Sequence, residues 1–363
     1  MNHRNRVLSS LSHNGYDRLP VRYYGEKEVD KKLMNYFNVN SEIEVKEILG
    51  DDFRYVWPDY KGPEPKTHND GSFEIPWPWR WPAGERYKSV MLNSGMLYDE
   101  VSYRPFESIS NPDELKKFTF PTVDWLDFSS IKSKCILYSD YAKVAGFGNV
   151  INFISGISHS LGIERTLMGL ATGDPVLLEL MEIKFNFHYE EIKHTLLAAS
   201  GDIDIVYIGE DLGTQLGPLI SLSSFDKYIA PYFTKFFNLV HNYNAKVMMH
   251  SCGSVYNFIP RLIELGLDIL DVVQVSSKDM NIQELSIKFG NSLCFSGSMD
   301  VQGFMVTGKP EDIINEVRLR QKLFPDGGLI IGPSHAIGVD VPIANIVAMY
   351  QAAGSLPNDF NNF

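Results

Sequence analysis

The chain has 363 residues, of which 44% are hydrophobic and 21% charged, so it can bury a large core and is not a disordered protein. Its formal net charge of -12 comes without a block of lysine or arginine, which argues against nucleic acid or an anionic membrane as partner. Its 3 cysteines are too few and too scattered for a disulfide framework.

The amino-terminal end is polar and gives no targeting signal. Residues 1–10 contain no apolar stretch long enough for a signal peptide, and no run of about 18 apolar residues occurs in the chain. We therefore expect a cytoplasmic protein without membrane contact, whose thiols stay reduced and free to bind metal. Cys135 and Cys294 lie in apolar runs and are expected in the core.

The first third of the chain offers few regular signals. Residues 19–24 and 54–57 are rich in valine and aromatic residues and are predicted to be strands. Residues 58–109 then interleave prolines with Trp77, Trp79 and Trp81. This composition predicts an irregular insertion that either packs its rings against the scaffold or covers the substrate as a lid, and we assign it no role from the sequence.

Strands and helices alternate regularly in the second half. Helices are predicted over 163–171 and 174–199, the second opened by an Asp-Pro pair. Short apolar runs follow, with centres roughly 23 to 42 residues apart, which suits strands joined by long helical crossovers. The predicted strands are 204–208, 246–249, 269–275, 293–296 and 329–331. The predicted helices are 224–243, 255–265, 281–289, 310–323 and 342–353.

This alternation predicts an α/β protein of the (β/α)8 TIM-barrel class. We expect one domain over residues 1–363, with an amino-terminal extension and the tryptophan- and proline-rich insertion at 58–109. Polar and titratable residues follow the predicted strands, and in a barrel the carboxyl ends of the strands surround one cavity. These residues are Glu210, Asp211, Gln215, His250, Cys252, Gln274, Asp300, Gln302 and His335.

His250 and Cys252 carry the sharpest signal. Side chains two apart on an extended strand share a face, and an imidazole and a thiolate on one face form half of a zinc site. His335, which follows the apolar run 328–331 and a Gly-Pro turn, is the best candidate for a third ligand. The alternative is that Cys252 is a small buried hydrophobe and that the histidines are ordinary hydrogen-bonded side chains.

The remaining polar residues at the strand ends have two interpretations each. Glu210 and Asp211 are candidates for proton transfer or for an oxygen ligand, and the alternative is that they cap and order the loop. His335, if it binds no metal, is a candidate for a base that orients the substrate. The cavity wall is predicted to bind substrate through Gln215, Gln274, Asp300 and Gln302.

These motifs together resemble the uroporphyrinogen decarboxylase superfamily. The likeness rests on Gly209-Glu-Asp-Leu-Gly-Thr-Gln, on His250-Ser-Cys-Gly with Pro260 and Leu262 after it, and on Gly332-Pro-Ser-His-Ala-Ile-Gly-Val-Asp-Val-Pro. It extends over nearly the whole chain and is closest to the branch of cobalamin-linked methyltransferases.

Two departures from the family's patterns bear on the activity. The heme-pathway decarboxylase has an arginine-rich segment near its first strand for the many carboxylates of its substrate, whereas this chain offers mainly Arg22 there. In the methyltransferase branch a later cysteine completes the zinc site, whereas this chain has Ser334-His335 at that place. Either His335 replaces the cysteine, or Glu210 or another oxygen ligand does, or zinc is not retained.

The resemblance implies a zinc-dependent methyltransferase that moves a methyl group between a small substrate or thiol and a cobalamin. We find no Asp-x-His-x-x-Gly signature for cobalamin binding, so the cofactor is expected on a separate corrinoid protein. Two other functions stay open: a decarboxylase or other lyase that uses the same cavity without metal, and a noncatalytic barrel that binds a small ligand. A homodimer also stays open.

Overall fold

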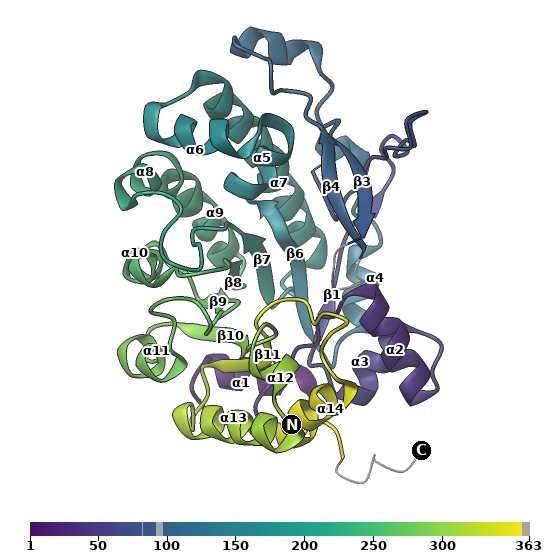
Figure 1. The fold of residues 1–363 in the computed structure, drawn as a ribbon, viewed down its shortest axis with the longest axis vertical. Coiled ribbons are helices and arrows are strands. Elements are labelled where there is room, and N and C mark those ends of the chain that lie inside the picture. Colours follow the sequence, from purple (N-terminus) through teal and green to yellow (C-terminus); the bar gives the residue numbers. More distant parts are fainter. Residues whose placement is uncertain (82, 92–96, 358–363) are drawn as a thin grey trace.

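The structure is a computed structural model that describes residues 1–81, 83–91 and 97–357. Within these residues a parallel sheet of 7 strands runs in the order β1-β6-β7-β8-β9-β10-β11 and is curled, with helices outside it (Figure 1). Its strands are β1 (Phe53–Tyr55), β6 (Ala142–Ile151), β7 (Ile205–Gly209), β8 (Lys246–His250), β9 (Ile269–Asp271), β10 (Cys294–Met299) and β11 (Leu329–Pro333). The predicted strands after residue 200 are thus confirmed, although β9 ends earlier than expected.

The first predicted strand, 19–24, forms only an isolated bridge. Val21 bridges Ile331 of β11 in parallel, and its carbonyl accepts from the Asp52 backbone N–H at 3.0 Å. The Val21 N–H, however, donates to the Asp52 carboxylate at 2.7 Å. Because a side chain and not a neighbouring strand accepts this N–H, residues 19–24 do not form an eighth strand. The segment connects the two edges of the sheet, but the predicted eight-stranded barrel is not completed.

The helices that cover the outside of the sheet agree closely with the sequence prediction. One exception is 224–243, which is divided at Ile229, because Pro231 has no N–H to continue the first helix. The helices of this half are α6 (Ile163–Thr172), α7 (Pro175–Ala199), α8 (Leu222–Tyr228), α9 (Ala230–Asn242), α10 (Ile259–Leu265), α11 (Ile282–Phe289), α12 (Phe304–Thr307), α13 (Pro310–Leu323) and α14 (Ile343–Ala352). None of the described helices is long and apolar enough to cross a bilayer.

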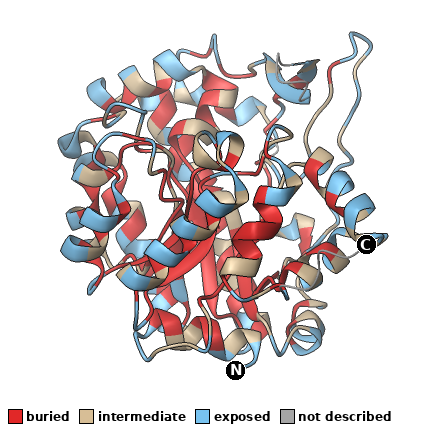
Figure 2. Ribbon diagram, turned by 60° about the horizontal axis from the view of Figure 1, so that its bottom comes forward, coloured by how far each residue is buried: buried red, intermediate tan, exposed pale blue. Residues whose placement is uncertain are grey.

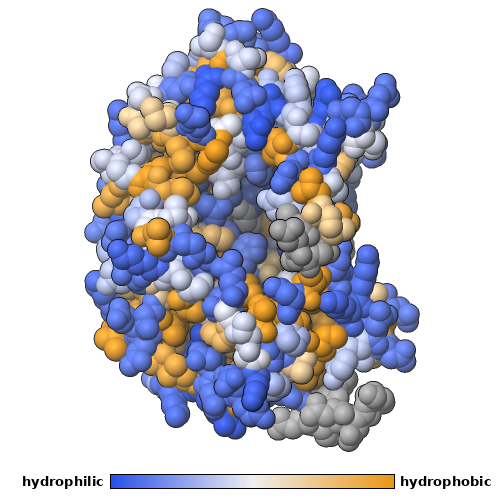
Figure 3. Space-filling model, in the orientation of Figure 1, coloured by the Kyte–Doolittle hydropathy of each residue, from blue (hydrophilic) through white to orange (hydrophobic). Residues whose placement is uncertain are grey.

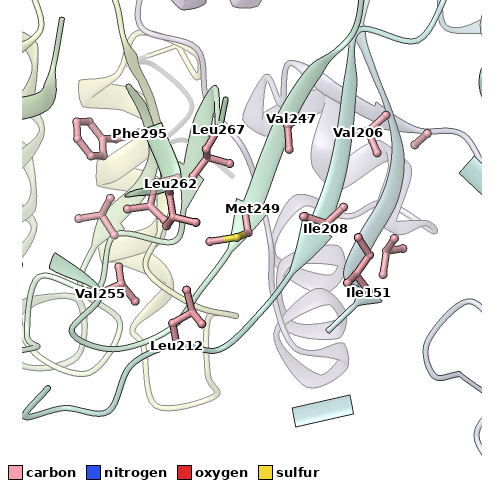
Figure 4. Close-up of a cluster of buried hydrophobic side chains, with 14 of the residues drawn as sticks. Ile151, Val206, Ile208, Leu212, Val247, Met249, Val255, Leu262, Leu267 and Phe295 are labelled. Atoms are coloured by element: carbon pink, nitrogen blue, oxygen red, sulfur yellow. The ribbon is translucent and has the colours of Figure 1, made fainter. Parts of the chain in front are cut away.

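The core is divided between the two faces of the sheet, because successive side chains of a strand point to opposite faces. Val206, Ile208, Val247 and Met249 pack outward against the helices (Figure 4), and the exposed residues lie on the far sides of those helices (Figure 2). The inner face has its own smaller core, which Val7 and Leu11 of α1 (His3–Leu11) join beside the amino-terminal ends of the strands. Its strand residues are Phe53, Ala142, Val144, Ile205, Tyr207, Met248, Ile269, Cys294 and Ile330.

The remaining elements lie mainly in the first half of the chain. They are the helices α2 (Lys27–Phe37), α3 (Glu42–Leu49), α4 (Ile131–Leu137) and α5 (Ile154–Leu161), the short strands β2 (Asp59–Tyr60) and β5 (Leu126–Asp127), and the 3-10 turns η1 (Pro112–Lys117), η2 (Val123–Trp125) and η3 (Tyr256–Phe258).

The insertion at 58–109 is less irregular than predicted. Its second half is an antiparallel pair, β3 (Arg86–Met91) and β4 (Leu97–Tyr103), at the upper right of Figure 1. These two strands contain no proline and include valine and tyrosine, which favour strands, so they form a longer ladder than the proline-rich first half does. The expectation of an irregular segment was therefore wrong for residues 86–91 and 97–103.

Candidate metal centre

Three side chains that the sequence singled out meet at the carboxyl ends of β8 and β11. His250 ends β8, Cys252 follows it by two residues, and His335 follows β11. One ligand atom of each lies within 4.8 Å of the others. His250 Nε2 and Cys252 Sγ are 3.2 Å apart, and the ring centroids of His250 and His335 are 6.1 Å apart.

His250 and Cys252 influence each other's protonation strongly. Burial raises the pKa of Cys252, but the charge and hydrogen bond of His250 outweigh it, so that the pKa of the thiol is lowered to about 7. Burial lowers the pKa of His250, whereas Cys252 and Asp271 raise it, and the net result lies well above the usual value. A thiol with this pKa is about half ionised near neutral pH and is a ready metal ligand.

A buried ion pair supports the other side of the His250 ring. Nδ1 of His250 lies 3.4 Å from the Tyr207 hydroxyl and 3.5 Å from the Asp271 carboxylate. Tyr207 donates to Asp271 at 2.5 Å, and Arg22 forms an ion pair with Asp271 at 2.9 Å. A carboxylate behind a histidine ring fixes the orientation of that ring, as is typical of histidines that bind metals.

Sequence reasoning missed Asp271 and Tyr207. The signal for Asp271 was an acidic residue within the apolar run 269–273, since such a charge is buried only when it has a partner. That partner is Arg22, which the sequence suggested only as a contact for a substrate carboxylate. Tyr207 carried no comparable signal, because tyrosine is common in strands.

Glu210 and Asp211 have different surroundings. Glu210 is fully buried and accepts the backbone N–H groups of Phe153 and Ile154, at 2.7 and 2.8 Å, where α5 begins. This is the capping contact that the sequence left open as an alternative. Asp211 faces the cluster: it accepts from the Cys252 backbone N–H at 3.2 Å, and its carboxylate lies 3.6 Å from His250 Nε2.

Three of the predicted wall residues form a chain of amides at one side of the site. The Gln302 side-chain oxygen accepts from Gln274 at 3.0 Å and from Gln215 at 3.3 Å. Gln274 in turn accepts from the Gly253 backbone N–H at 2.8 Å, which holds the turn after Cys252. Asp300 is buried and accepts from the Gln302 backbone N–H at 3.1 Å, so it orders the loop from inside.

An aromatic rim adjoins the metal-capable residues. The Phe147 ring contacts those of Tyr24, Tyr207 and Trp79 at 6.0, 5.7 and 5.7 Å, and Tyr24 contacts His335 at 6.4 Å. Trp79 comes from the insertion, so this segment reaches the rim of the site. Figure 3 shows a hollow in the surface, at about the place where Figure 1 shows β6 and β7.

The sequence matches a known protein family. The family model "Uroporphyrinogen decarboxylase (URO-D)" matches residues 159–356, which is more than half of the chain. The protein belongs to this family. The matched segment includes His250, Cys252 and His335.

Individual relatives are named as methyltransferases. Over 240 residues the chain is 24% identical to the methylcobamide:CoM methyltransferase MtbA of Methanosarcina acetivorans, which covers 59% of this chain and 67% of that protein. It is 23% identical over 139 residues, or 38% of this chain and 35% of the relative, to the methylated-thiol–coenzyme M methyltransferase of Methanosarcina mazei. A solved structure of a methyltransferase from Methanosarcina mazei shares the fold, with a TM-score of 0.62, 14% identity and 98% of each chain covered.

Proposed function

We propose that this protein is a methyltransferase that moves a methyl group between a small substrate or thiol and a cobalamin carried by a separate corrinoid protein. The observation that carries the proposal is the convergence of His250, Cys252 and His335 within 4.8 Å. The methyltransferase names of its relatives support the class of reaction. We also propose that residues 1–363 form one domain and that the curled sheet belongs to the (β/α)8 barrel class.

The donor set of the site fits zinc. Two imidazoles and one thiolate are ligands that zinc prefers, and three protein ligands leave one position of a tetrahedral site for a substrate. Ligand atoms of such a site lie about 3.5 Å apart, close to the 3.2 Å between His250 and Cys252. In this proposal His335 replaces the later cysteine of related methyltransferases. Zinc bound here would lower the pKa of a substrate thiol so that it reacts as a thiolate.

The residues of this chain would position the ligands and the substrate. Asp271 and Tyr207 would orient the His250 ring, and Asp211 and Gln274 would hold the turn that carries Cys252. Asp211 also has a carboxylate oxygen near His250, where it can take the proton that a thiol gives up on binding. We assign Glu210 to the start of α5 rather than to proton transfer, because both of its oxygens accept backbone N–H groups.

The site gives little support to decarboxylation of a polycarboxylate substrate. Arg22, which lies in the first predicted strand, is 3% exposed and is paired with Asp271. Its charge is therefore already neutralised and is not free to bind a substrate carboxylate.

Replacement of Cys252 tests the reaction. We expect Cys252→Ala to abolish methyl transfer and to leave the fold intact, because Cys252 lies beyond the end of β8 and its loss removes little packing. The measurement is the cobalamin absorbance change after the protein is mixed with a methylated corrinoid protein and a series of thiols. Cys135→Ala, which removes a buried thiol of α4, is the matched control and should keep the activity.

Circular dichroism of both variants serves as the folding control. A folded Cys252→Ala protein that transfers methyl groups as fast as the parent would contradict the role of this thiolate. Failure of the parent with every thiol and every methyl donor would favour the lyase or the binding protein instead.

A further inference from the structure

The chain of amides beside Cys252 has a direction, and a backbone group sets it. The Gly253 N–H can only donate, so the Gln274 side chain turns its oxygen toward it, at 2.8 Å, and its NH2 group away. That NH2 group donates to the Gln302 side-chain oxygen at 3.0 Å. Gln302 therefore also turns its oxygen toward the chain and its own NH2 group away from it.

Gln215 supports the same orientation of Gln302. The Gln215 side-chain oxygen accepts from the Ser277 hydroxyl at 3.1 Å, and its NH2 group donates to the Gln302 oxygen at 3.3 Å. A reversed Gln302 amide would place its NH2 group against two other NH2 groups and would lose both hydrogen bonds. The Gln302 backbone N–H donates to Asp300 at 3.1 Å, which holds the residue in place.

The chain of amides thus ends in a hydrogen-bond donor with a fixed direction. The two side-chain N–H groups of Gln302 have no acceptor among the described residues, and Gln302 is exposed. Its oxygen lies within about 8 Å of the Gly253 nitrogen, because a single planar amide separates the two hydrogen bonds. Cys252 directly precedes Gly253, so one small molecule can extend from the Cys252 thiol to Gln302.

The charges around this donor favour an uncharged acceptor. The side-chain partners of Gln302 are two neutral amides, and its backbone partner is the Asp300 carboxylate. The Asp211 carboxylate accepts from the Cys252 backbone N–H at 3.2 Å and adds a second negative charge. An anion bound at Gln302 is repelled by these carboxylates, whereas an uncharged oxygen gains the hydrogen bond without repulsion.

We propose that Gln302 binds the substrate through its side-chain N–H groups, and that the group it binds is an uncharged oxygen such as that of an ester, amide or ether. This inference rests on the proposed function and assigns a substrate class to it. The metal-capable residues hold the reacting end of the substrate, and Gln302 selects the other end. The amides of Gln274 and Gln215 act through Gln302, because they fix the direction of its N–H groups.

The test is calorimetric binding of three thiols of similar length to the zinc-incubated protein. Methyl 3-mercaptopropionate offers an uncharged acceptor and no donor, 3-mercaptopropionate is an anion, and 1-pentanethiol has no acceptor. We expect the parent to bind the ester more tightly than the anion. The ratio of ester affinity to pentanethiol affinity measures the hydrogen bond, and loss of the Gln302 donor should lower this ratio roughly five- to tenfold.

Two variants remove the donor in different ways. In Gln302→Glu the carboxylate still accepts from Gln274 and Gln215, so the chain of amides stays in place but no N–H faces the ligand. Gln302→Met removes the donor without adding a charge, and it replaces the glutamate variant if that one fails to fold. Gln283→Glu, which adds the same charge at an exposed position of α11, is the matched control and should keep the parent ratio.

A second control separates a neutral acceptor from an acid. Lys278 is an exposed cation whose backbone N–H donates to the Gln215 carbonyl at 3.0 Å. We expect Lys278→Gln to leave the ester affinity unchanged. If the parent binds the anion more tightly than the ester and Lys278→Gln removes this preference, a cation and not Gln302 selects the substrate, and the inference is wrong.

The outcomes also separate this inference from the proposed function. If both Gln302 variants keep the parent ratio, the role of Gln302 is wrong and the methyltransferase proposal stands. If no thiol binds to the parent, the thiol chemistry is wrong, and methyl propionate, which lacks the thiol, then tests Gln302 by ligand-observed NMR. Binding of methyl propionate that is lost in Gln302→Met supports the inference, whereas unchanged or absent binding overturns it.

Discussion

A buried ion pair of Arg22 and Asp271 lies behind the His250 ring of the candidate metal centre. Arg22 and Asp271 are 3% and 0% exposed, and removal of either partner leaves the other charge buried and unpaired. We estimate the cost in stability at about 3–5 kcal/mol. Asp271 lies 3.5 Å from Nδ1 of His250, while Nε2 of the same ring lies 3.2 Å from Cys252 Sγ, so we expect the pair to orient the ring.

Tyr207 allows the orientation of His250 to be tested without loss of the pair. Tyr207→Phe keeps the ring in the inner core but removes the hydroxyl that contacts Asp271 and His250. We expect zinc affinity to fall about tenfold while the fold is kept, because groups behind a ligating histidine tune its affinity. The measurement is zinc binding in competition with a chelating dye. Tyr232→Phe, which removes a hydroxyl bound to Glu182, should leave zinc affinity unchanged, and a parent-like Tyr207→Phe would refute the positioning role.

Among the elements, the carboxyl ends of β8 and β11 were predictable, whereas strand β6, which lies between β1 and β7, was not. The apolar runs before His250 and His335 predicted both strands, and the two-residue spacing of His250 and Cys252 predicted their shared face. Strand β6 was missed because glycines interrupt its apolar pattern. Gly146 needs its positive φ of 81°, and a Cβ there would lie 2.4 Å from the Tyr207 carbonyl oxygen. The register of β6 shifts after this glycine, and Phe147 reaches the rim of the site.

Helix α5 gives a prediction about pH. The folded-state pKa of His159 is about 4, below its ordinary value of 6.5, mainly through burial and then through Arg80, Lys184 and Arg104. The unfolded chain therefore binds a proton between about pH 6.5 and pH 4 that the folded chain does not, and stability falls as the pH falls through this window. Between pH 7 and pH 4, the free energy of unfolding of His159→Gln should fall by roughly 1–3 kcal/mol less than that of the parent. Urea unfolding at several pH values measures this difference, and parallel curves for the two proteins would contradict it.

For the molecule as a whole, the sequence predicted an α/β fold with a parallel sheet, and the candidate ligands at its strand ends, but not how the sheet closes. The alternation after residue 200 implied strands whose carboxyl ends meet, and the structure brings His250, Cys252 and His335 together there. The sequence could not show that the Asp52 carboxylate accepts the Val21 backbone N–H, because this contact joins segments far apart in the chain. The contact of the insertion with the rim was also beyond sequence patterns, since it depends on how Trp79 packs against Phe147.

Metal analysis of the purified protein shows whether one zinc ion binds through His250, Cys252 and His335. We expect about one zinc per chain in protein prepared without chelator, and an X-ray absorption spectrum with one sulfur and two imidazole ligands. His335→Ala should remove one imidazole from that spectrum, and Cys252→Ala should remove the sulfur. Less than about a tenth of a zinc per chain after incubation with the metal, or a bound zinc without a sulfur ligand, would contradict the account.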